Sequence, residues 1–505
     1  MLKITKKECE SSCEYILPDY LGDIRKVLSV SASATPAGNF VSDGEVHISG
    51  IVNYNILYSD AENKLSSIET TSDFDVKAPL DEGFVDTNTD TRVANFGVRV
   101  NGPRKITVKS QLKSDIYSEY PDTVEYSGDA FAKAEDLQTL TTVINSENML
   151  FGTLKEREYA EEAEEVAAPA DSIEIITSSG LVRIIETIPV DGGVEVKGEL
   201  IVTAIITTDV GEPFAIKKTV PFDETISIEG GNENMQPSAD AYLTSLTVNA
   251  VDRGEGSVIT VNAISDFTAK MAYNSEVSII KDAYLKNAKT EEVYSDYSYK
   301  ELVKSGNAEL SFKKSIPRVE IGAENVKEIL GVTADARQSG VAIRGGVCTI
   351  MGELMFSGVA CQINENSELR YIPLKFSAPY ELNVNLNCHL PEDTVFEAAV
   401  SVADVALYID SVDASCEVLL KLVYRAYIPK TVKRLSECSQ VDALAEDENE
   451  ASVTVYYPEA GETLFSIAKA FRKSPSDIAR DNNLDIAVSA DSSNALLSVK
   501  KLMIK

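Results

Sequence analysis

Residues 45–58 read Glu-Val-His-Ile-Ser-Gly-Ile-Val-Asn-Tyr-Asn-Ile-Leu-Tyr, a run that alternates apolar and polar residues around an interior glycine. Similar runs begin at Glu195 and Cys348. Period-two alternation rich in Val, Ile and Tyr predicts strands with one buried face, and a glycine at a fixed strand position indicates a bulge or a close backbone approach. A phenylalanine follows each glycine after 24 residues, and an aliphatic residue lies six residues further: Gly50, Phe74 and Leu80; Gly198, Phe222 and Ile228; Gly352, Phe376 and Leu382.

The repeated pattern predicts a mainly β fold of three tandem β-sandwich-like repeats, followed by a small α+β domain of order βααβ. Three copies of one unit favour a scaffold over a catalyst. The expected boundaries are 1–150 for an N-terminal segment and the first repeat, 151–171 for a charged helical linker, 172–285 for the second repeat, 286–318 for a connecting segment, 319–438 for the third repeat, 439–451 for an acidic linker and 452–505 for the α+β domain.

Two charged stretches are expected to act as linkers. Residues 155–169 are rich in Glu and Ala, which predicts a solvated helix or a semi-rigid spacer. Residues 439–450 are rich in Asp and Glu, which predicts a flexible acidic tether that leaves the last domain free.

The end of the chain predicts a strand, two helices and a second strand. Residues 453–456 alternate like a strand, and Gly-Glu-Thr-Leu at 461–464 opens a run with apolar residues at helical spacing. Ser474 is the expected N-cap of a second helix, which the Asn pair 482–483 ends. Residues 497–504 are the expected second strand.

The charge of the chain is unevenly distributed. The formal net charge is −33, which argues against nucleic acid or an anionic membrane as the main partner. From Val453 onward there are seven Lys or Arg against six Asp or Glu, so this end carries +1 and the preceding residues carry −34. An acidic body with a locally basic end suggests that the end docks and the body stays soluble.

Cysteine usage favours a reducing compartment. The seven cysteines include no C-x-x-C pair, and none lies between Cys13 and Cys348, which indicates neither a disulfide framework nor a zinc site. We therefore expect reduced thiols in the cytoplasm. The charged first ten residues do not resemble a secretory signal, and no run reaches the roughly 18 apolar residues that a membrane helix requires, so no membrane insertion is expected.

A search for catalytic groups favours a protein that is not an enzyme. The only histidines are His47 and His389, the latter beside Cys388, and adjacency in sequence does not make a catalytic dyad. No phosphate-binding loop, nucleophile elbow or metalloprotease motif is present, and no cofactor or metal is expected. The sequence alone does not exclude a pair of catalytic carboxylates.

The end of the chain resembles a LysM module, a small domain that binds wall glycans or proteins. The resemblance rests on Gly-Glu-Thr-Leu at 461–464, the Phe-Ser-Ile-Ala that follows, and the Asn pair. It departs at 489–505, where the Gly and Pro typical of LysM modules are missing. The turn glycine, capping Thr and core Leu are also expected as local architecture. The resemblance implies ligand or partner contacts at Gly461, Glu462, Thr463, Leu464, Asn482 and Asn483.

The body resembles the SPOCS domain (DUF3794) of sporulation proteins. The resemblance rests on residues 14–24, Glu-Tyr-Ile-Leu-Pro-Asp-Tyr-Leu-Gly-Asp-Ile, on the Val-x-Gly strand, and on Asp282-Ala283-Tyr284. Tandem SPOCS domains followed by a LysM module are similar to SipL-type spore coat morphogenetic proteins.

This resemblance implies a non-catalytic scaffold or adaptor in endospore coat assembly. It would act in the cytoplasm of the mother cell, at the forespore surface. The LysM module would dock on a coat morphogenetic ATPase of the stage IV sporulation protein A type, and the SPOCS repeats would recruit other coat proteins. The alternative is a cell-wall or spore-cortex protein whose LysM module binds the N-acetylglucosamine glycan of peptidoglycan. A third hypothesis is a hydrolase that its LysM module targets.

Overall fold

The computed structural model divides the chain into two compact units. Unit 1 contains Met1–Tyr120, Asn148–Tyr273 and Leu302–Tyr427, and unit 2 contains Pro121–Glu147, Asn274–Glu301 and Ile428–Lys505. The structure describes residues 2–120, 126–132, 135–209, 211–254, 256–344, 346–363, 368–385, 391, 393–410, 412–443, 453–459, 461–484, 496 and 499–505.

The first repeat is a sandwich of two three-stranded antiparallel sheets. One sheet has the order β2-β3-β4 and the other β1-β6-β5. Alternating apolar residues of both sheets share one core, as Ile48 of β3 and Leu112 of β6 illustrate. The strands are β1 (Leu2–Ile16), β2 (Ile24–Ser42), β3 (Glu45–Asp60), β4 (Leu65–Pro79), β5 (Asp86–Gly102) and β6 (Lys105–Glu119).

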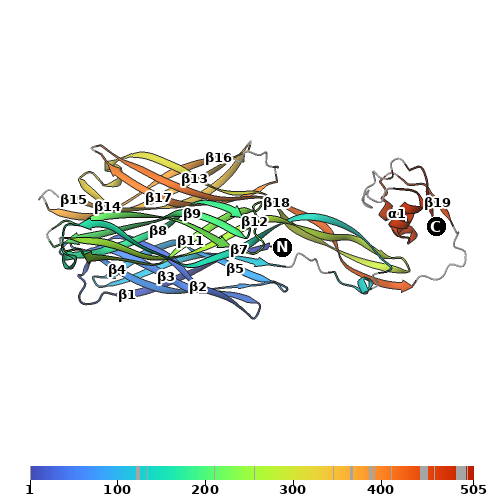
Figure 1. The fold of residues 1–505 in the computed structure, drawn as a ribbon, viewed down its shortest axis with the longest axis horizontal. Helices are drawn as coiled ribbons and strands as arrows, with labels where there is room; N and C mark the ends of the chain where they lie inside the picture. The colour runs from blue at the N-terminus through green and yellow to red at the C-terminus, as the bar shows by residue number, and fades with distance from the viewer. Residues whose placement is uncertain are drawn as a thin grey trace. The chain divides into compact units, whose positions relative to one another are not determined.

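The second and third repeats have the same strand order, so the prediction of a mainly β fold with three sandwich-like repeats is confirmed. Their sheets are β8-β9-β10 with β7-β12-β11, and β14-β15-β16 with β13-β18-β17. In unit 1 the repeats form three bands, coloured blue, green and yellow to orange in Figure 1. The strands are β7 (Leu137–Val166), β8 (Ile173–Val190), β9 (Gly193–Thr208), β10 (Phe214–Ser227), β11 (Gln236–Asp252), β12 (Ser257–Leu285), β13 (Ala288–Pro317), β14 (Val326–Arg344), β15 (Val347–Ile363), β16 (Leu369–Asn385), β17 (Val395–Ile409) and β18 (Asp413–Ala443).

The prediction of a charged helical linker at 151–171 is wrong. Residues 151–166 belong to β7, which is the first strand of the second repeat and pairs with β12. Tyr159 is buried, accepts a hydrogen bond from Ser265 of β12, and meets Phe222 edge to face. The neighbouring charges are held by partners on the same repeat, for example Lys155 by Asp266 at 2.8 Å. Burial of a few apolar residues therefore overrides the helical propensity of the Glu and Ala between them.

The connecting segment expected at 286–318 is also a strand. Residues 288–317 form β13, which pairs with β18 as the first strand of the third repeat. The short 3-10 turn η3 (Arg318–Ile321) then leads into β14, as η2 (Ala170–Ser172) leads into β8. Residues 439–443 of the expected acidic linker belong to β18, and residues 444–452 lie outside the described residues.

The interior glycine of each repeat is a point of close approach between strands. Gly50 pairs with Phe74 and Gly198 pairs with Phe222, as their equal spacing suggested. Gly352, however, pairs with Tyr380, and Phe376 pairs with Phe356, so the expected equivalence of Phe376 is wrong. The register between β15 and β16 therefore differs from that of the first two repeats. A Cβ on any of these glycines would be closer to the facing ring than van der Waals contact allows. The distances would be 2.6 Å from Phe74, 2.5 Å from Phe222 and 2.5 Å from Tyr380.

A shared apolar core joins the three repeats in unit 1, and β-bulges supply three of its buried residues. Strands β2, β8 and β14 each have a bulge at an equivalent position, where the ladder skips Leu28, Ile176 or Leu330. All three side chains are buried together in a cluster that we call the inter-repeat core. Each lies beside a residue of the middle strand that follows its glycine by seven positions; these are Leu57, Ile205 and Val359.

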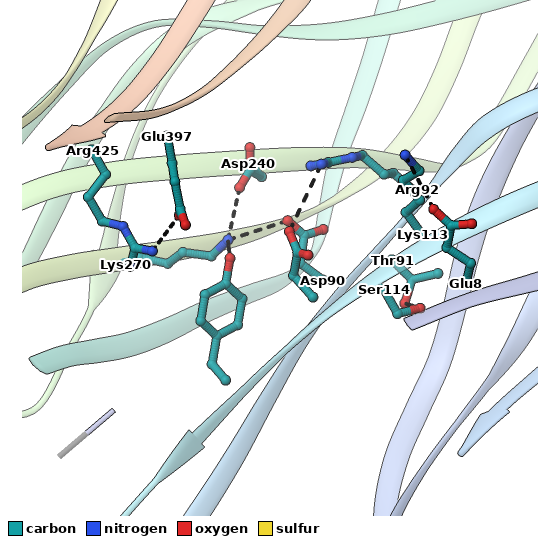
Figure 2. A network of polar contacts seen from close by, with 12 residues as sticks. Glu8, Asp90, Thr91, Arg92, Lys113, Ser114, Asp240, Lys270, Glu397 and Arg425 are labelled. Atoms are coloured by element: carbon teal, nitrogen blue, oxygen red, sulfur yellow. Dashed lines mark hydrogen bonds and ion pairs between the residues drawn. The ribbon is translucent and has the colours of Figure 1, made fainter. Parts of the chain in front are cut away.

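A buried polar network also links the repeats, and Figure 2 shows its members Lys270, Asp90 and Asp240. The Lys270 ammonium of β12 lies 3.4 Å from Asp90 of β5 and 3.3 Å from Asp240 of β11. The Tyr242 hydroxyl donates to Asp90, and Lys270 donates to the Tyr117 hydroxyl at 3.4 Å. Since Lys270 is only 7% exposed, these partners compensate a charge that water does not reach.

Unit 2 contains segments of four long strands. The segments come from β7, β12, β13 and β18, with the 3-10 turn η1 (Asp129–Ala132) beside them. β12 ends at Leu285 and β13 begins at Ala288. We call residues 282–292 the β12–β13 corner. Buried Ala283, Leu285 and Ala288 of the corner pack against Leu435 and Cys438 of β18.

Candidate functional site

The last part of unit 2 has the predicted order βααβ. Its elements are β19 (Thr454–Tyr456), α1 (Leu464–Phe471), α2 (Pro475–Asp481) and β20 (Leu502–Ile504). The two strands pair antiparallel, and β20 is shorter than the expected strand at 497–504, of which residues 497 and 498 lie outside the described residues. α1 and β19 carry the red colours of the chain's end in Figure 1. Neither helix of the described chain is long and apolar enough to cross a bilayer.

Helix α1 begins because Thr463 caps it and apolar residues cover its inner face. The Ser466 amide donates to the Thr463 hydroxyl at 3.1 Å, and the Thr463 amide donates to the Ser466 hydroxyl at 3.0 Å, which makes a reciprocal capping box. Leu464, Ile467 and Ala468 are buried in the core of this domain. The helix ends at Arg472, which adopts the left-handed conformation with φ of 55°.

The loop 461–464 was predicted to contact a ligand, and its side chains make contacts that hold the loop. Gly461 has φ of 96°, a conformation that favours glycine. The Glu462 carboxylate accepts from the Tyr456 hydroxyl at 2.7 Å and from the Glu459 amide at 2.8 Å. Thr463 caps α1 and Leu464 is a core residue. These contacts match the expectation of local architecture.

The Asn pair has a similar role at the end of α2. Asn482 donates to the Ile478 carbonyl at 2.8 Å and to the Met503 carbonyl at 2.7 Å, and accepts from the Met503 amide at 2.6 Å. Asn482 thereby fixes β20 to α2. Asn483 takes the left-handed position with φ of 50°. Residues 489–495, where the chain begins to depart from the LysM pattern, lie outside the described residues.

The C-terminal end of α1 contacts the β12–β13 corner. The Lys469 ammonium lies 2.7 Å from the Asp282 carboxylate and 3.0 Å from the Glu292 carboxylate. The Arg472 guanidinium donates to the carbonyl of Leu285 at 3.0 Å and to that of Ala288, across the turn that ends β12. Two residues of the locally basic end, Lys469 and Arg472, therefore have a polypeptide partner within unit 2.

Tyr284 is the aromatic centre of this contact. Its side chain is 0% exposed and belongs to the core cluster of the βααβ domain. Its ring meets Phe465 edge to face, with centroids 5.3 Å apart, and its hydroxyl donates to the Lys473 carbonyl at 2.5 Å. An aromatic pair of this geometry contributes about 0.5–1.5 kcal/mol beyond the area it buries. The last domain is therefore held by the corner, contrary to the expectation of a free domain on a tether.

The contact perturbs the ionisation of its members. Burial opposes the charged form of Lys469, yet hydrogen bonds to Asp282 and Glu292 raise the pKa of its ammonium above the ordinary value. Burial raises the pKa of the Tyr284 phenol, while the charge of Arg472 opposes that change. Both groups thus keep the protonated forms that the contact requires at neutral pH.

Other sequence candidates do not gather here. His47 of β3 stacks on Phe40 of β2 with ring centroids 4.8 Å apart, and Cys388 and His389 lie outside the described residues. Among the described residues, no group of three or more His, Cys, Asp or Glu is arranged to hold a metal ion. A pocket of about 370 Å³ between the first two repeats is lined by Asp86, Asn88, Glu119, Glu229 and residues 149–153.

Comparisons with known proteins agree with the two parts of this fold. The family model described as "SipL, SPOCS domain" matches residues 23–101 and 172–251, and the LysM domain model matches residues 459–487. Comparisons with curated proteins and with solved structures each gave no match. The SPOCS matches cover most of the strands of the first two repeats, and the third repeat shares their strand order.

These findings define a protein of non-catalytic binding domains, with tandem β-sandwiches followed by a LysM domain. The two SPOCS matches followed by the LysM match agree with the expected tandem SPOCS domains and C-terminal LysM domain. The matches support a sporulation-related protein with a domain capable of binding peptidoglycan.

The site residues that sequence reasoning missed are those of the corner. Asp282 and Tyr284 were noted only as part of a family resemblance, and Glu292 was not singled out. The available signal was the pattern itself, a tyrosine flanked by carboxylates at the junction of two repeats. Nothing in the sequence indicated that α1 would cover it.

Proposed function

We propose that this protein is a non-catalytic adaptor in endospore coat assembly. The LysM domain docks to a coat morphogenetic ATPase of the stage IV sporulation protein A type at the forespore surface, on the cytoplasmic side in the mother cell. The SPOCS repeats recruit further coat proteins. The SPOCS and LysM matches support this proposal, because both models describe non-catalytic binding domains and this chain has them in the expected order.

The contact of α1 with the corner is the observation that favours a protein as the partner of the LysM domain. The LysM domain covers Tyr284 and pairs Lys469 with two carboxylates, so its helical face is suited to bind polypeptide. Four of the residues for which the LysM resemblance implies ligand contacts instead make contacts within the domain. They are Glu462, Thr463, Leu464 and Asn482.

The body is suited to present several surfaces at once. The inter-repeat core and the Lys270 network join the three repeats of unit 1, so that each sandwich is held against its neighbours. Among the described strands, each outer strand of a sheet pairs on one side, and an incoming strand could add hydrogen bonds at its other edge. The net charge of −33 restrains indiscriminate pairing between copies.

The second candidate is a cell-wall or spore-cortex protein that binds the N-acetylglucosamine glycan of peptidoglycan. The match of the LysM model to residues 459–487 favours it, since this range includes the loop 461–464 and the Asn pair. Gly461 and Asn483 keep the backbone conformations that shape these turns.

Sedimentation separates the two candidates. The full chain is mixed with the polymerised coat ATPase or with purified peptidoglycan, and each mixture is centrifuged beside a chain that lacks residues 453–505. We expect the full chain to sediment with the ATPase polymer and the truncated chain to stay in the supernatant. Sedimentation with peptidoglycan that added ATPase does not reduce would favour the glycan-binding candidate instead.

A further inference from the structure

We propose that α1 of the LysM domain is an exchangeable polypeptide-binding surface whose ligand is the β12–β13 corner, and that a second copy of this chain supplies the same corner in trans. Copies of the chain would then join by exchanging LysM domains. The proposal does not rest on the proposed function, because both the surface and its ligand belong to this chain.

The recognition chemistry is a tyrosine between two carboxylates. Asp282 and Glu292 receive the Lys469 ammonium, and Tyr284 lies between them in the chain and against Phe465. The Arg472 guanidinium binds the backbone of the corner by donating to the carbonyls of Leu285 and Ala288, on either side of the turn. The ligand is therefore recognised by side-chain chemistry and by the shape of the turn together.

The ion pairs can open without leaving a fully buried charge. The side chains are 29% exposed for Lys469, 24% for Asp282 and 18% for Glu292. Water can therefore solvate each charge when the contact breaks, which keeps the cost well below that of a fully buried pair.

Reclosure is favoured because opening exposes apolar surface. Tyr284 and Phe465 are 0% and 2% exposed in the closed contact, so both rings meet water when α1 leaves the corner. Any surface that restores the same contact removes this cost. A second copy offers an identical corner, so exchange forms the same bonds that it breaks.

High local concentration decides whether the contact closes within one copy or between two. In dilute solution the LysM domain meets its own corner first, since the two are covalently linked. On a surface that collects many copies, the neighbouring corner becomes an equal competitor. The contact then links copies and needs no additional interface.

Charge reversal tests the exchange with full-length chains. Copy A carries Asp282→Lys and Glu292→Lys, and copy B carries Lys469→Glu, so each alone has like charges across the contact. Mixed together, the LysM domain of A matches the corner of B, and that of B matches the corner of A. We expect each variant alone to be a monomer by mass photometry and light scattering, and their mixture to form a heterodimer.

Hydrogen exchange at residues 282–292 reports the contact itself. We expect protection of these amides to be lost in A and in B, and to return in the mixture. A chain with all three substitutions should regain protection as a monomer, which shows that the substitutions do not unfold the corner. The matched control carries Glu291→Lys and Asp296→Lys, two exposed acidic positions on β13, and should keep full protection.

Two results would overturn the proposal. A mixture of A and B that remains monomeric and unprotected would mean that the surface is not exchangeable. Undiminished protection in both A and B would mean that Lys469, Asp282 and Glu292 do not hold the contact. Neither readout involves the coat ATPase or peptidoglycan, so failure here is distinct from failure of the proposed function.

Discussion

Lys270 is the residue on which the polar network of unit 1 depends. Replacing it with Met, which has a similar length, leaves Asp90 and Asp240 without their cation. Breaking a buried pair from one side costs about 3–5 kcal/mol, because the remaining charge stays buried. We expect Lys270→Met to lower the free energy of unfolding of unit 1 by about this amount in urea titrations. The double variant with Asp90→Asn should lose less, and an equal or larger loss would contradict this account.

The same network predicts how acid affects stability. Burial alone raises the pKa of the Asp90 carboxyl, but the charge of Lys270 and the Tyr242 hydrogen bond leave it below its ordinary value of 3.8. Asp90 therefore stabilises the folded state fully above its unfolded pKa of about 3.8, and this contribution is lost as pH falls through the lower folded pKa. Urea midpoints measured from pH 6 down to about pH 2 should fall less steeply for Asp90→Asn than for the natural chain.

At the residue scale, the sequence predicted sites of close approach better than it predicted partners. The fixed glycine indicated a tight contact, and Gly50 and Gly198 do pack against Phe74 and Phe222. Spacing failed for Gly352, because the register between β15 and β16 pairs Tyr380 with the glycine. Lys270 was not predicted as a buried residue, since a lysine in an alternating strand is ordinarily exposed.

At the element scale, two bulges of β8 offer a matched test of the inter-repeat core. The ladder skips Ile176 and Ile185, which have the same chemistry in the same strand. Ile176 is 5% exposed in the inter-repeat core, whereas Ile185 is 42% exposed. We expect Ile176→Ala to cost about 2–5 kcal/mol in urea titrations, and Ile185→Ala to change stability by less than about 0.5 kcal/mol. Equal losses would mean that the shared core does not hold the repeats together.

Strand type was predictable where alternation was clean and failed where charge masked it. The middle strands β3, β9 and β15 were all anticipated from their sequence. In β7 the run 155–166 contains mostly Glu and Ala, and a few inward residues such as Tyr159 decide its conformation through contacts with distant strands. Such long-range pairing is not encoded in the local pattern.

The candidate site was predictable as a domain and not as a surface. The capping box at Thr463 and the apolar spacing of α1 follow from local chemistry, and the βααβ order was expected on that basis. Which face of α1 is covered depends on the corner, which lies 189 residues away in sequence at its Tyr284 to Lys473 hydrogen bond. No local signal encodes a contact of that separation.

At the scale of the whole molecule, each unit has its own source of stability. The core clusters of unit 1 draw on all three repeats, with Ala426 as their last residue. The clusters of unit 2 combine the strand ends of the second and third repeats with the LysM domain. The contacts between repeats therefore belong to unit 1, and the contacts that hold the LysM domain belong to unit 2.

Removing residues 453–505 should separate these two sources. Unit 1 keeps every residue of its core clusters, so its thermal transition in calorimetry should stay at the same temperature. In unit 2, Tyr284 and Leu140 lose the residues that cover them, so amides of the corner should exchange faster while those of the inter-repeat core do not change. A lowered unit 1 transition would show that the LysM domain also stabilises the body, which would contradict the division into two independent sources.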